Sequence, residues 1–203
     1  IDCNVACPAS LEEAFARTVR ETVACNNWPA DFPYAPQVGF RIFHTGADLL
    51  LRFDVAERCT AARTLDDNGP VWTDSCAEFF FRPEGSDSYY NFECNCIGTL
   101  LVGHRRDRTQ AEHAPAEVLR TVRRRATYPH APLPETEGDN RWTLTLAIPA
   151  AALFRDRIAG WDGVQGAMNL YKCGDDLSCP HYLSWRPVGT PAPDFHRPEF
   201  FEP

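Results

Sequence analysis

Apolar residues alternate with other residues at a period of two in several stretches of this 203-residue chain, and this pattern constrains the fold most. Alternation of this kind puts successive side chains on opposite faces of a β-strand. It predicts strands at residues 38–43, 49–55, 75–82, 89–97, 142–148, 166–172 and 181–185. Several short strands joined by turn-rich connections favour a mostly β fold, an antiparallel β-sandwich of the jelly-roll or immunoglobulin-like kind.

The N-terminal segment follows a helical period instead. Ser10 and Glu13 have the spacing of a capping box, and apolar residues then recur on one helical face as far as Val23. We therefore expect a short helix in residues 1–27, which lead into the sandwich. No internal repeat or linker divides the chain, so residues 1–203 are predicted to form a single domain.

The connection over residues 103–140 has a weaker pattern. It is polar and rich in proline, and the chain as a whole carries 17 prolines. We expect this stretch to be mostly irregular, with one strand near residues 118–125 and a short helical turn following at residues 149–154. So many prolines also disfavour a helical bundle, because proline removes a backbone donor and breaks helices.

The charge balance narrows the choice of partners. The formal net charge is −8, whereas nucleic-acid binders need clustered positive charge, so we expect no nucleic-acid partner. A group of arginines within residues 120–125 is interpreted as a solvated face. No run of 18 apolar residues is present, and we expect no membrane partner.

Nine cysteines cannot all pair within one chain. Cys94 and Cys96 share one face of a predicted strand and, with Cys76, are interpreted as reduced core thiols. Reduced thiols slightly favour a cytoplasmic setting, with export as the alternative. Because no signal peptide is visible, the compartment stays open. Cys3 and Cys7 could pair or remain free.

The segment from Cys173 to His181 raises the question of a metal. Cys173, Cys179 and His181 could bind zinc, but the spacing of the thiols is wider than usual zinc sites have. A disulfide between Cys173 and Cys179, or two free thiols, is the favoured interpretation. Asp175 and Asp176 could contribute to a calcium site, although aspartates are also common turn residues.

Polar side chains gather on two predicted strands in the middle of the chain. Asn91, Glu93 and Asn95 share one strand face, and Glu78 lies on the preceding strand, close after Trp72. Carboxylates and amides hydrogen-bond sugar hydroxyls, and an indole stacks on the apolar face of a pyranose. The alternative is a solvated sheet face that carries a surface tryptophan.

The motifs in this region resemble those of family 9 carbohydrate-binding modules, and particularly of their stand-alone bacterial relatives. The motifs that carry the resemblance are Trp72-Thr73-Asp74-Ser75-Cys76-Ala77-Glu78-Phe79-Phe80, Phe92-Glu93-Cys94-Asn95, Met168-Asn169-Leu170, Leu183-Ser184-Trp185 and Asp194-Phe195-His196-Arg197-Pro198-Glu199-Phe200-Phe201. The resemblance implies a β-sandwich that holds the ends of glycans between two aromatic side chains, often with structural calcium and with no other cofactor.

Carried over by position, Trp72 is one stacking aromatic and Glu78 a hydroxyl-binding carboxylate. Phe195 stands where the family has its second stacking tryptophan, and Glu93 stands where the family has an arginine. The predicted ligand-binding residues are Trp72, Glu78, Asn91, Glu93, Asn95, Trp185, Phe195, His196 and Arg197.

The sequence thus predicts non-catalytic binding of a mono- or oligosaccharide, with no catalytic residues. One alternative is a glycoside-processing enzyme that uses Glu78 and Glu93 as paired carboxylates, since glycosidases use such pairs. Another is a sandwich that has lost sugar binding and serves as an interaction module.

Overall fold

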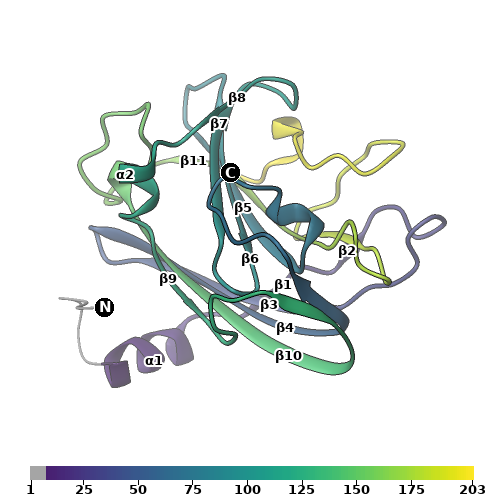
Figure 1. Ribbon diagram of the computed structural model, residues 1–203. Helices are drawn as coiled ribbons and strands as arrows, with labels where there is room; N and C mark the ends of the chain where they lie inside the picture. Colours follow the sequence, from purple (N-terminus) through teal and green to yellow (C-terminus); the bar gives the residue numbers. More distant parts are fainter. Residues whose placement is uncertain (1–7) are drawn as a thin grey trace.

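Two antiparallel sheets pack face to face in the computed structural model, which describes residues 8–203, with side chains from residue 11 onward (Figure 1). The predicted antiparallel β-sandwich is confirmed. Cys3 and Cys7 lie outside the described residues, as does the side chain of Ser10.

The smaller sheet has five strands and the larger has seven. The five-stranded sheet runs in the order β1 (Glu21–Thr22), β3 (Gln37–His44), β4 (Asp48–Ala62), β10 (Leu133–Pro149) and β9 (Arg123–Ala126). The seven-stranded sheet runs β2 (Cys25–Asn26), β12 (Tyr182–Ser184), β11 (Gly166–Cys173), β5 (Cys76–Pro83), β6 (Tyr89–Asn95), β7 (Leu100–Arg105) and β8 (Ala111–His113). Three single-turn helices lie at Val71–Thr73 (η1), Ala150–Ala152 (η2) and Pro198–Phe200 (η3).

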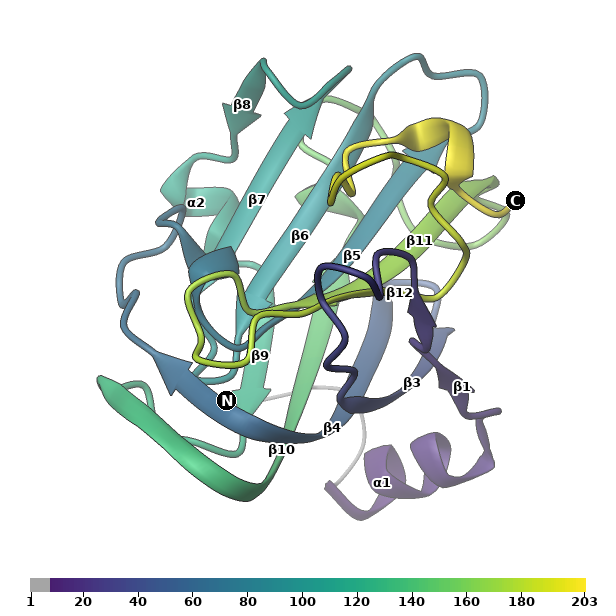
Figure 2. The same ribbon diagram turned by 90° about the vertical axis from the view of Figure 1, so that its right-hand side faces the viewer.

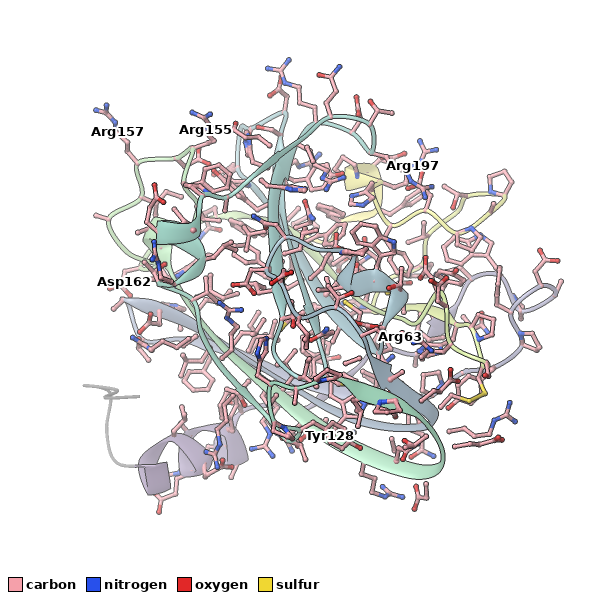
Figure 3. All side chains as sticks on the ribbon, viewed as in Figure 1. Arg63, Tyr128, Arg155, Arg157, Asp162 and Arg197 are labelled. Atoms are coloured by element: carbon pink, nitrogen blue, oxygen red, sulfur yellow. A yellow bond between two sulfur atoms is a disulfide. The ribbon has the colours of Figure 1, made fainter. Side chains whose placement is uncertain are left out.

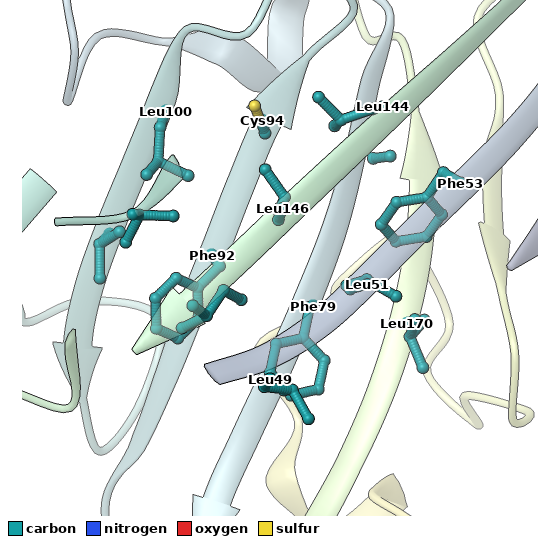
Figure 4. Packing of buried hydrophobic residues seen from close by; sticks show 14 of the residues in the cluster. Leu49, Leu51, Phe53, Phe79, Phe92, Cys94, Leu100, Leu144, Leu146 and Leu170 are labelled. Carbon is teal, nitrogen blue, oxygen red and sulfur yellow. The ribbon is translucent and has the colours of Figure 1, made fainter. Parts of the chain in front are cut away.

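The main core lies between the two sheets. Side chains of β4 and β10 pack there against those of β5, β6, β7 and β11, as Figure 4 shows for Leu51, Leu146, Phe79, Phe92 and Leu170. The alternation along β6 is as predicted, because its apolar members turn into this core and its polar members turn to the opposite face of the sheet.

The outer face of the seven-stranded sheet is also covered. C-terminal loops, yellow in Figure 2, cross in front of β5, β6 and β11. Phe195 and Phe201 from these loops join a second apolar cluster with Phe80, Tyr89 and Tyr171 of the sheet. Because both of its faces are covered, almost every residue of β5 and β6 is buried, polar residues included. A polar side chain on this outer face is therefore enclosed rather than solvated.

The N-terminal helix is shorter than predicted. Helix α1 spans Pro8–Arg17, so it begins two residues before Ser10, and the chain then turns into β1 and β2. Val19 is 74% exposed, whereas Val23 is buried in the main core and bonds through its backbone N–H to the carbonyl of Val38. The prediction that the helix continues to Val23 was wrong because pairing of the backbone with the sheet competes with the helix for the same segment. Within the described part of the chain, no helix has the length and apolarity to cross a membrane.

Residues 103–140 hold more regular structure than predicted. They contain the end of β7, β8, helix α2 (Ala116–Leu119), β9 and the start of β10. The strand expected near residues 118–125 is a helical turn followed by β9. Strands β8 and β9 are short edge strands with exposed residues, so they lack the apolar alternation that marks a buried strand.

The predicted disulfide between Cys173 and Cys179 was wrong. Cys179 is bonded to Cys59 of β4, 120 residues away along the chain, with the two Cα atoms 6.0 Å apart. Cys173 instead lies on the outer face of β11 as a buried free thiol. The pairing was missed because the segment after β11 turns toward the other sheet, which sequence spacing does not reveal. The prediction that Cys76, Cys94 and Cys96 are buried free thiols is confirmed.

Candidate functional site

A cavity of about 280 Å³ opens on the outer face of the seven-stranded sheet. Five of the predicted ligand-binding residues line it: Trp72, Glu78, Glu93, Phe195 and His196. They come from η1, β5, β6 and the C-terminal loop, which are distant in sequence. The sandwich therefore brings the predicted aromatic and carboxylate side chains together in one concave site.

Two carboxylates form the floor of this cavity. Glu78 on β5 and Glu93 on β6 are directly opposite each other in the antiparallel ladder, and each is 3% exposed. Burial, followed by the charge of Glu93, raises the pKa of Glu78 well above its usual range. Burial also raises the pKa of Glu93, to about 7. Near neutral pH this pair retains a proton, so it offers both a donor and acceptors to a ligand.

Glu93 is held by side chains that the sequence did not link to it. The amide of Asn91 donates to Glu93 Oε1 at 2.8 Å, and Arg105 Nε of β7 donates to the amide oxygen of Asn91 at 2.9 Å. Gly103 lies opposite Asn91, where a Cβ would come within 2.5 Å of the Asn91 side-chain oxygen. A glycine is thus required for this amide to bridge Arg105 and Glu93. Arg105, from the neighbouring strand, thus reaches Glu93 through Asn91.

Trp72 provides the exposed aromatic surface of the site, with 39% of its surface accessible. It lies on η1, and its backbone carbonyl accepts hydrogen bonds from the backbone N–H of Asp175 at 3.1 Å and from the thiol of Cys173 at 3.5 Å. The N–H of Asp176 donates to the carbonyl of Thr73 at 3.2 Å. The loop after β11 therefore fixes the backbone that carries the indole.

Phe195 and His196 form the opposite wall. The Phe195 ring is 9% exposed and stacks on Tyr171, with ring centroids 4.2 Å apart, so its role is to close the wall rather than to offer a free aromatic face. His196 Nδ1 lies 3.0 Å from the Tyr89 hydroxyl. Burial, then the charges of the nearby arginines, lowers the pKa of His196 to about 3, so its imidazole is neutral near pH 7.

Four predicted residues do not line the cavity. Asn91 is the bridge described above, and Asn95 bonds the Thr64 carbonyl and Asp74 within the fold. Trp185 packs against Phe40 at the main core. Arg197 lies at the periphery of the molecule (Figure 3) and pairs with Asp194 at 2.7 Å.

The residues considered for metal binding are dispersed. Cys179 is in the disulfide, and His181 lies within hydrogen-bond distance of Lys172 in the interior, so the zinc set that was considered and disfavoured from the sequence does not assemble. Asp175 lines the cavity, whereas Asp176 is exposed outside it. Burial, followed by the charge of Asp176, raises the pKa of Asp175 to about 6. The calcium site stays a prediction.

Several lining residues were missed by the sequence. Arg105, Arg108 and His113 come from β7, β8 and their connection, and Tyr182 comes from β12. The alternation of Leu101, Gly103 and Arg105 was a usable signal, since it places Arg105 on the outer face of a strand. Arg108 lies in a loop and His113 on the edge strand β8, where the sequence carried no comparable signal, whereas Tyr182 lies within the strand predicted at residues 181–185.

Comparison with known proteins identifies the family. The profile of carbohydrate-binding family 9 matches residues 7–203. The chain belongs to this family. Family 9 members are non-catalytic modules, and the function of this chain is non-catalytic carbohydrate binding.

Solved structures agree with this assignment. A candidate carbohydrate-binding protein from Bacteroides uniformis is 42% identical over 96% of this chain and 88% of its own, with a TM-score of 0.91. A family 9 module from Caldicellulosiruptor kristjanssonii, solved with glucose, is 7% identical over 88% of this chain and 79% of its own, with a TM-score of 0.53. The structure of a family 9 module from the same organism with cellotriose is 8% identical over 94% of this chain and 83% of its own, with a TM-score of 0.53. These two share the fold. A search among curated proteins returned no match.

Proposed function

We propose that this family 9 protein binds a monosaccharide, or the end of a short oligosaccharide, in the cavity between Trp72 and the Glu78–Glu93 pair. The observation that carries this proposal is the convergence of an exposed indole with buried hydrogen-bonding groups in one concave site. An indole face packs against the C–H groups of a pyranose, while the carboxyl pair bonds its hydroxyls.

The size of the site supports a short ligand. Its volume of about 280 Å³ lies just below the ~300–1,000 Å³ range of small-molecule sites. One sugar ring fills much of such a space, and a second would extend into solvent past Trp72. A long glycan chain would bind through one terminal unit.

The placement of the carboxylates supports binding rather than glycoside hydrolysis. Glycosidases use two carboxyl groups that flank the scissile bond. Glu78 and Glu93 are neighbours on the same face of one sheet, so they approach a ligand from the same side. The neutral His196 and the guanidinium of Arg105 complete a site with both donors and acceptors.

Calorimetric titration with glucose, cello-oligosaccharides and a wider glycan panel tests the proposal. The expected result is saturable binding of at least one saccharide with unit stoichiometry. Trp72→Ala should weaken this binding by about tenfold or more, because aromatic anchors at the centre of a site contribute most of the binding energy. Its folding stability should change little, since the indole is partly exposed.

Trp185→Phe is the matched control, because Trp185 is an indole that lies outside the cavity. It should leave the affinity unchanged. If no saccharide on the panel binds, or if Trp72→Ala binds as tightly as the wild type, the proposal fails and the interaction-module alternative is favoured.

A further inference from the structure

Two cysteines and a glutamate meet beneath the cavity floor. Cys76 and Glu78 lie on one face of β5, and Cys173 is directly opposite Cys76 on β11. One ligand atom from each of the three side chains lies within 4.8 Å of the other two. We infer that Cys76, Glu78 and Cys173 form a binding site for a zinc ion. This inference goes beyond saccharide binding and does not depend on it.

The spacing of the donor atoms suits a tetrahedral ion. Zinc–sulfur bonds of about 2.3 Å and zinc–oxygen bonds of about 2.0–2.2 Å place neighbouring ligand atoms roughly 3.4–3.8 Å apart. The Cys173 sulfur is 3.1 Å from Glu78 Oε1, and the other two pairs of donor atoms, Cys76 with Cys173 and Cys76 with Glu78, each lie within 4.8 Å. Movements of these donor atoms by no more than about 1 Å therefore bring them to the spacing of a tetrahedral site.

The surrounding charge favours a cation. Glu78 is almost wholly buried, with Glu93 opposite it and Asp175 on the adjacent loop. Among the described residues, neither Glu78 nor Glu93 forms an ion pair, and the charges of Lys172 near Glu78 and of Arg105 near Glu93 only partly offset the effect of burial on the two pKa values. A buried carboxylate without a cationic partner is costly, and a bound divalent ion removes that cost.

The donor set selects the kind of metal. Two thiolates favour zinc over calcium or magnesium, which prefer oxygen ligands. Three protein ligands leave one position of a tetrahedral ion free, and Glu78 and Cys173 both line the cavity. A water molecule would occupy that fourth position.

Binding exchanges protons for the ion. Each thiol loses its proton to solvent when its sulfur coordinates zinc, and the carboxyl loses any proton that it shares. Burial keeps both thiols protonated in the metal-free protein, where the pKa of Cys76 is raised to about 12. These thiols are therefore poor nucleophiles without the ion, and the site is a binding site.

Titration of the full chain with Zn²⁺ alone, without sugar, is the direct test. We expect one ion per chain and a thiolate-to-metal charge-transfer absorption when Co²⁺ replaces zinc. Cys76→Ser and Cys173→Ser should each lower the zinc affinity by roughly tenfold or more, as the loss of a ligand must exceed the effect of losing an outer-shell partner. Cys25→Ser is the matched control, since this free thiol lies on β2 outside the cluster, and it should bind zinc as the wild type does.

Three results would overturn the inference. One is the absence of saturable zinc binding, or of the cobalt–thiolate absorption, in the wild-type protein, which decides the matter even if a serine variant fails to fold. Another is a folded Cys76→Ser or Cys173→Ser variant with wild-type zinc affinity. The third is a Cys76–Cys173 disulfide found by peptide mass analysis of the purified chain. Saccharide binding is titrated separately on the metal-free protein, so a failure of zinc binding can be distinguished from a failure of the proposed saccharide binding.

Discussion

Glu57 and Glu78 are both almost wholly buried, and each faces one of two consecutive residues of β11, yet they differ in their partners. Glu57 lies between the sheets against Lys172, whose Nζ is 2.8 Å from Glu57 Oε2. Glu78 lies on the outer face against the thiol of Cys173, 3.1 Å away. Consecutive side chains of β11 point to opposite faces of the sheet, so Glu57 meets the cation of Lys172 on one face and Glu78 meets the uncharged thiol of Cys173 on the other.

The partners of Glu57 form a network inside the fold. Trp142 Nε1 and the Thr60 hydroxyl donate to Glu57 Oε1 at 2.6 and 2.9 Å, and Lys172 Nζ also lies 2.7 Å from His181 Nε2. Burial alone would raise the pKa of Glu57, but Lys172, His181 and the hydrogen bonds outweigh it and lower that pKa. These interactions join the two sheets, and Glu57 is buried away from the cavity.

The contrast teaches how to distinguish a structural from a functional buried charge. The pKa of Glu57 is lowered and that of Glu78 is raised, although burial acts on both in the same direction. A fold tolerates an unpaired buried carboxylate at a cost in stability, and such costs concentrate at functional sites. Variants on the two sides of β11 should therefore have opposite effects on stability.

Lys172→Met should have the largest effect. It removes the cation and leaves Glu57 uncompensated, so the free energy of unfolding should fall by about 3–5 kcal/mol. Urea denaturation near pH 7 measures this loss. The double variant Lys172→Met/Glu57→Gln should recover part of the stability, since it removes both charges. A loss below about 1 kcal/mol for the single variant would contradict the role assigned to the network.

Acidification should weaken the same region. Burial, then Lys172, lowers the pKa of His181 to about 3, while an unfolded histidine titrates near 6.5. Between these values the unfolded chain binds the additional proton, so the stabilisation is complete above pH ~6.5 and is lost as the pH falls toward 3. The slope from this one residue is up to about 1.4 kcal/mol per pH unit.

Chemical denaturation across pH 4–8 checks this dependence. His181→Gln should flatten the curve by that amount, because glutamine does not titrate. His196 contributes in the same direction, so the unfolding free energy of the variant should still rise with pH, but less steeply than that of the wild type. An unchanged slope in His181→Gln would show that His181 does not resist protonation.

Glu78→Gln should have the smallest effect and the opposite sign. The raised pKa of Glu78 means that its contribution is favourable below about pH 4.5 and is lost as the pH rises through the folded-state pKa. Glutamine cannot ionise, so at pH 8 with a chelator present the variant should be more stable by on the order of 1 kcal/mol. The gain should disappear near pH 4. Glu57→Gln is the matched control and should lower the free energy of unfolding at pH 8. If both variants lose a similar amount of stability, the distinction between a structural and a functional buried carboxylate is wrong.

The sequence was sufficient for the sandwich and for the faces of its central strands. Period-two alternation separated Glu93 from the apolar residues of its strand, and in the structure Glu93 and Glu78 share the outer face because the apolar members of β5 and β6 fill the core. The same alternation could not show that loops cover the outer face. It therefore did not reveal that Phe195 would be closed in by Tyr171.

The errors have a common physical origin. Trp185 and Asn95 have the chemistry of sugar-binding residues, but tertiary contacts that the sequence does not specify use them inside the fold. The Cys59–Cys179 bond joins segments 120 residues apart, and residues that meet at such separations leave no local pattern. Arg105 was missed because β7 ends in a polar connection that was interpreted as irregular.

The hydrogen bonds that hold Trp72 have a consequence for the thermodynamics of recognition. The loop after β11 fixes the η1 backbone, and the Cys59–Cys179 bond ties the end of that loop to the other sheet. The backbone that carries the indole is thus ordered when the chain folds, so this part of the entropy cost of binding does not fall on the binding step. If Trp72 is the sugar-stacking residue proposed above, reducing the Cys59–Cys179 bond should weaken saccharide binding, although neither cysteine lines the cavity.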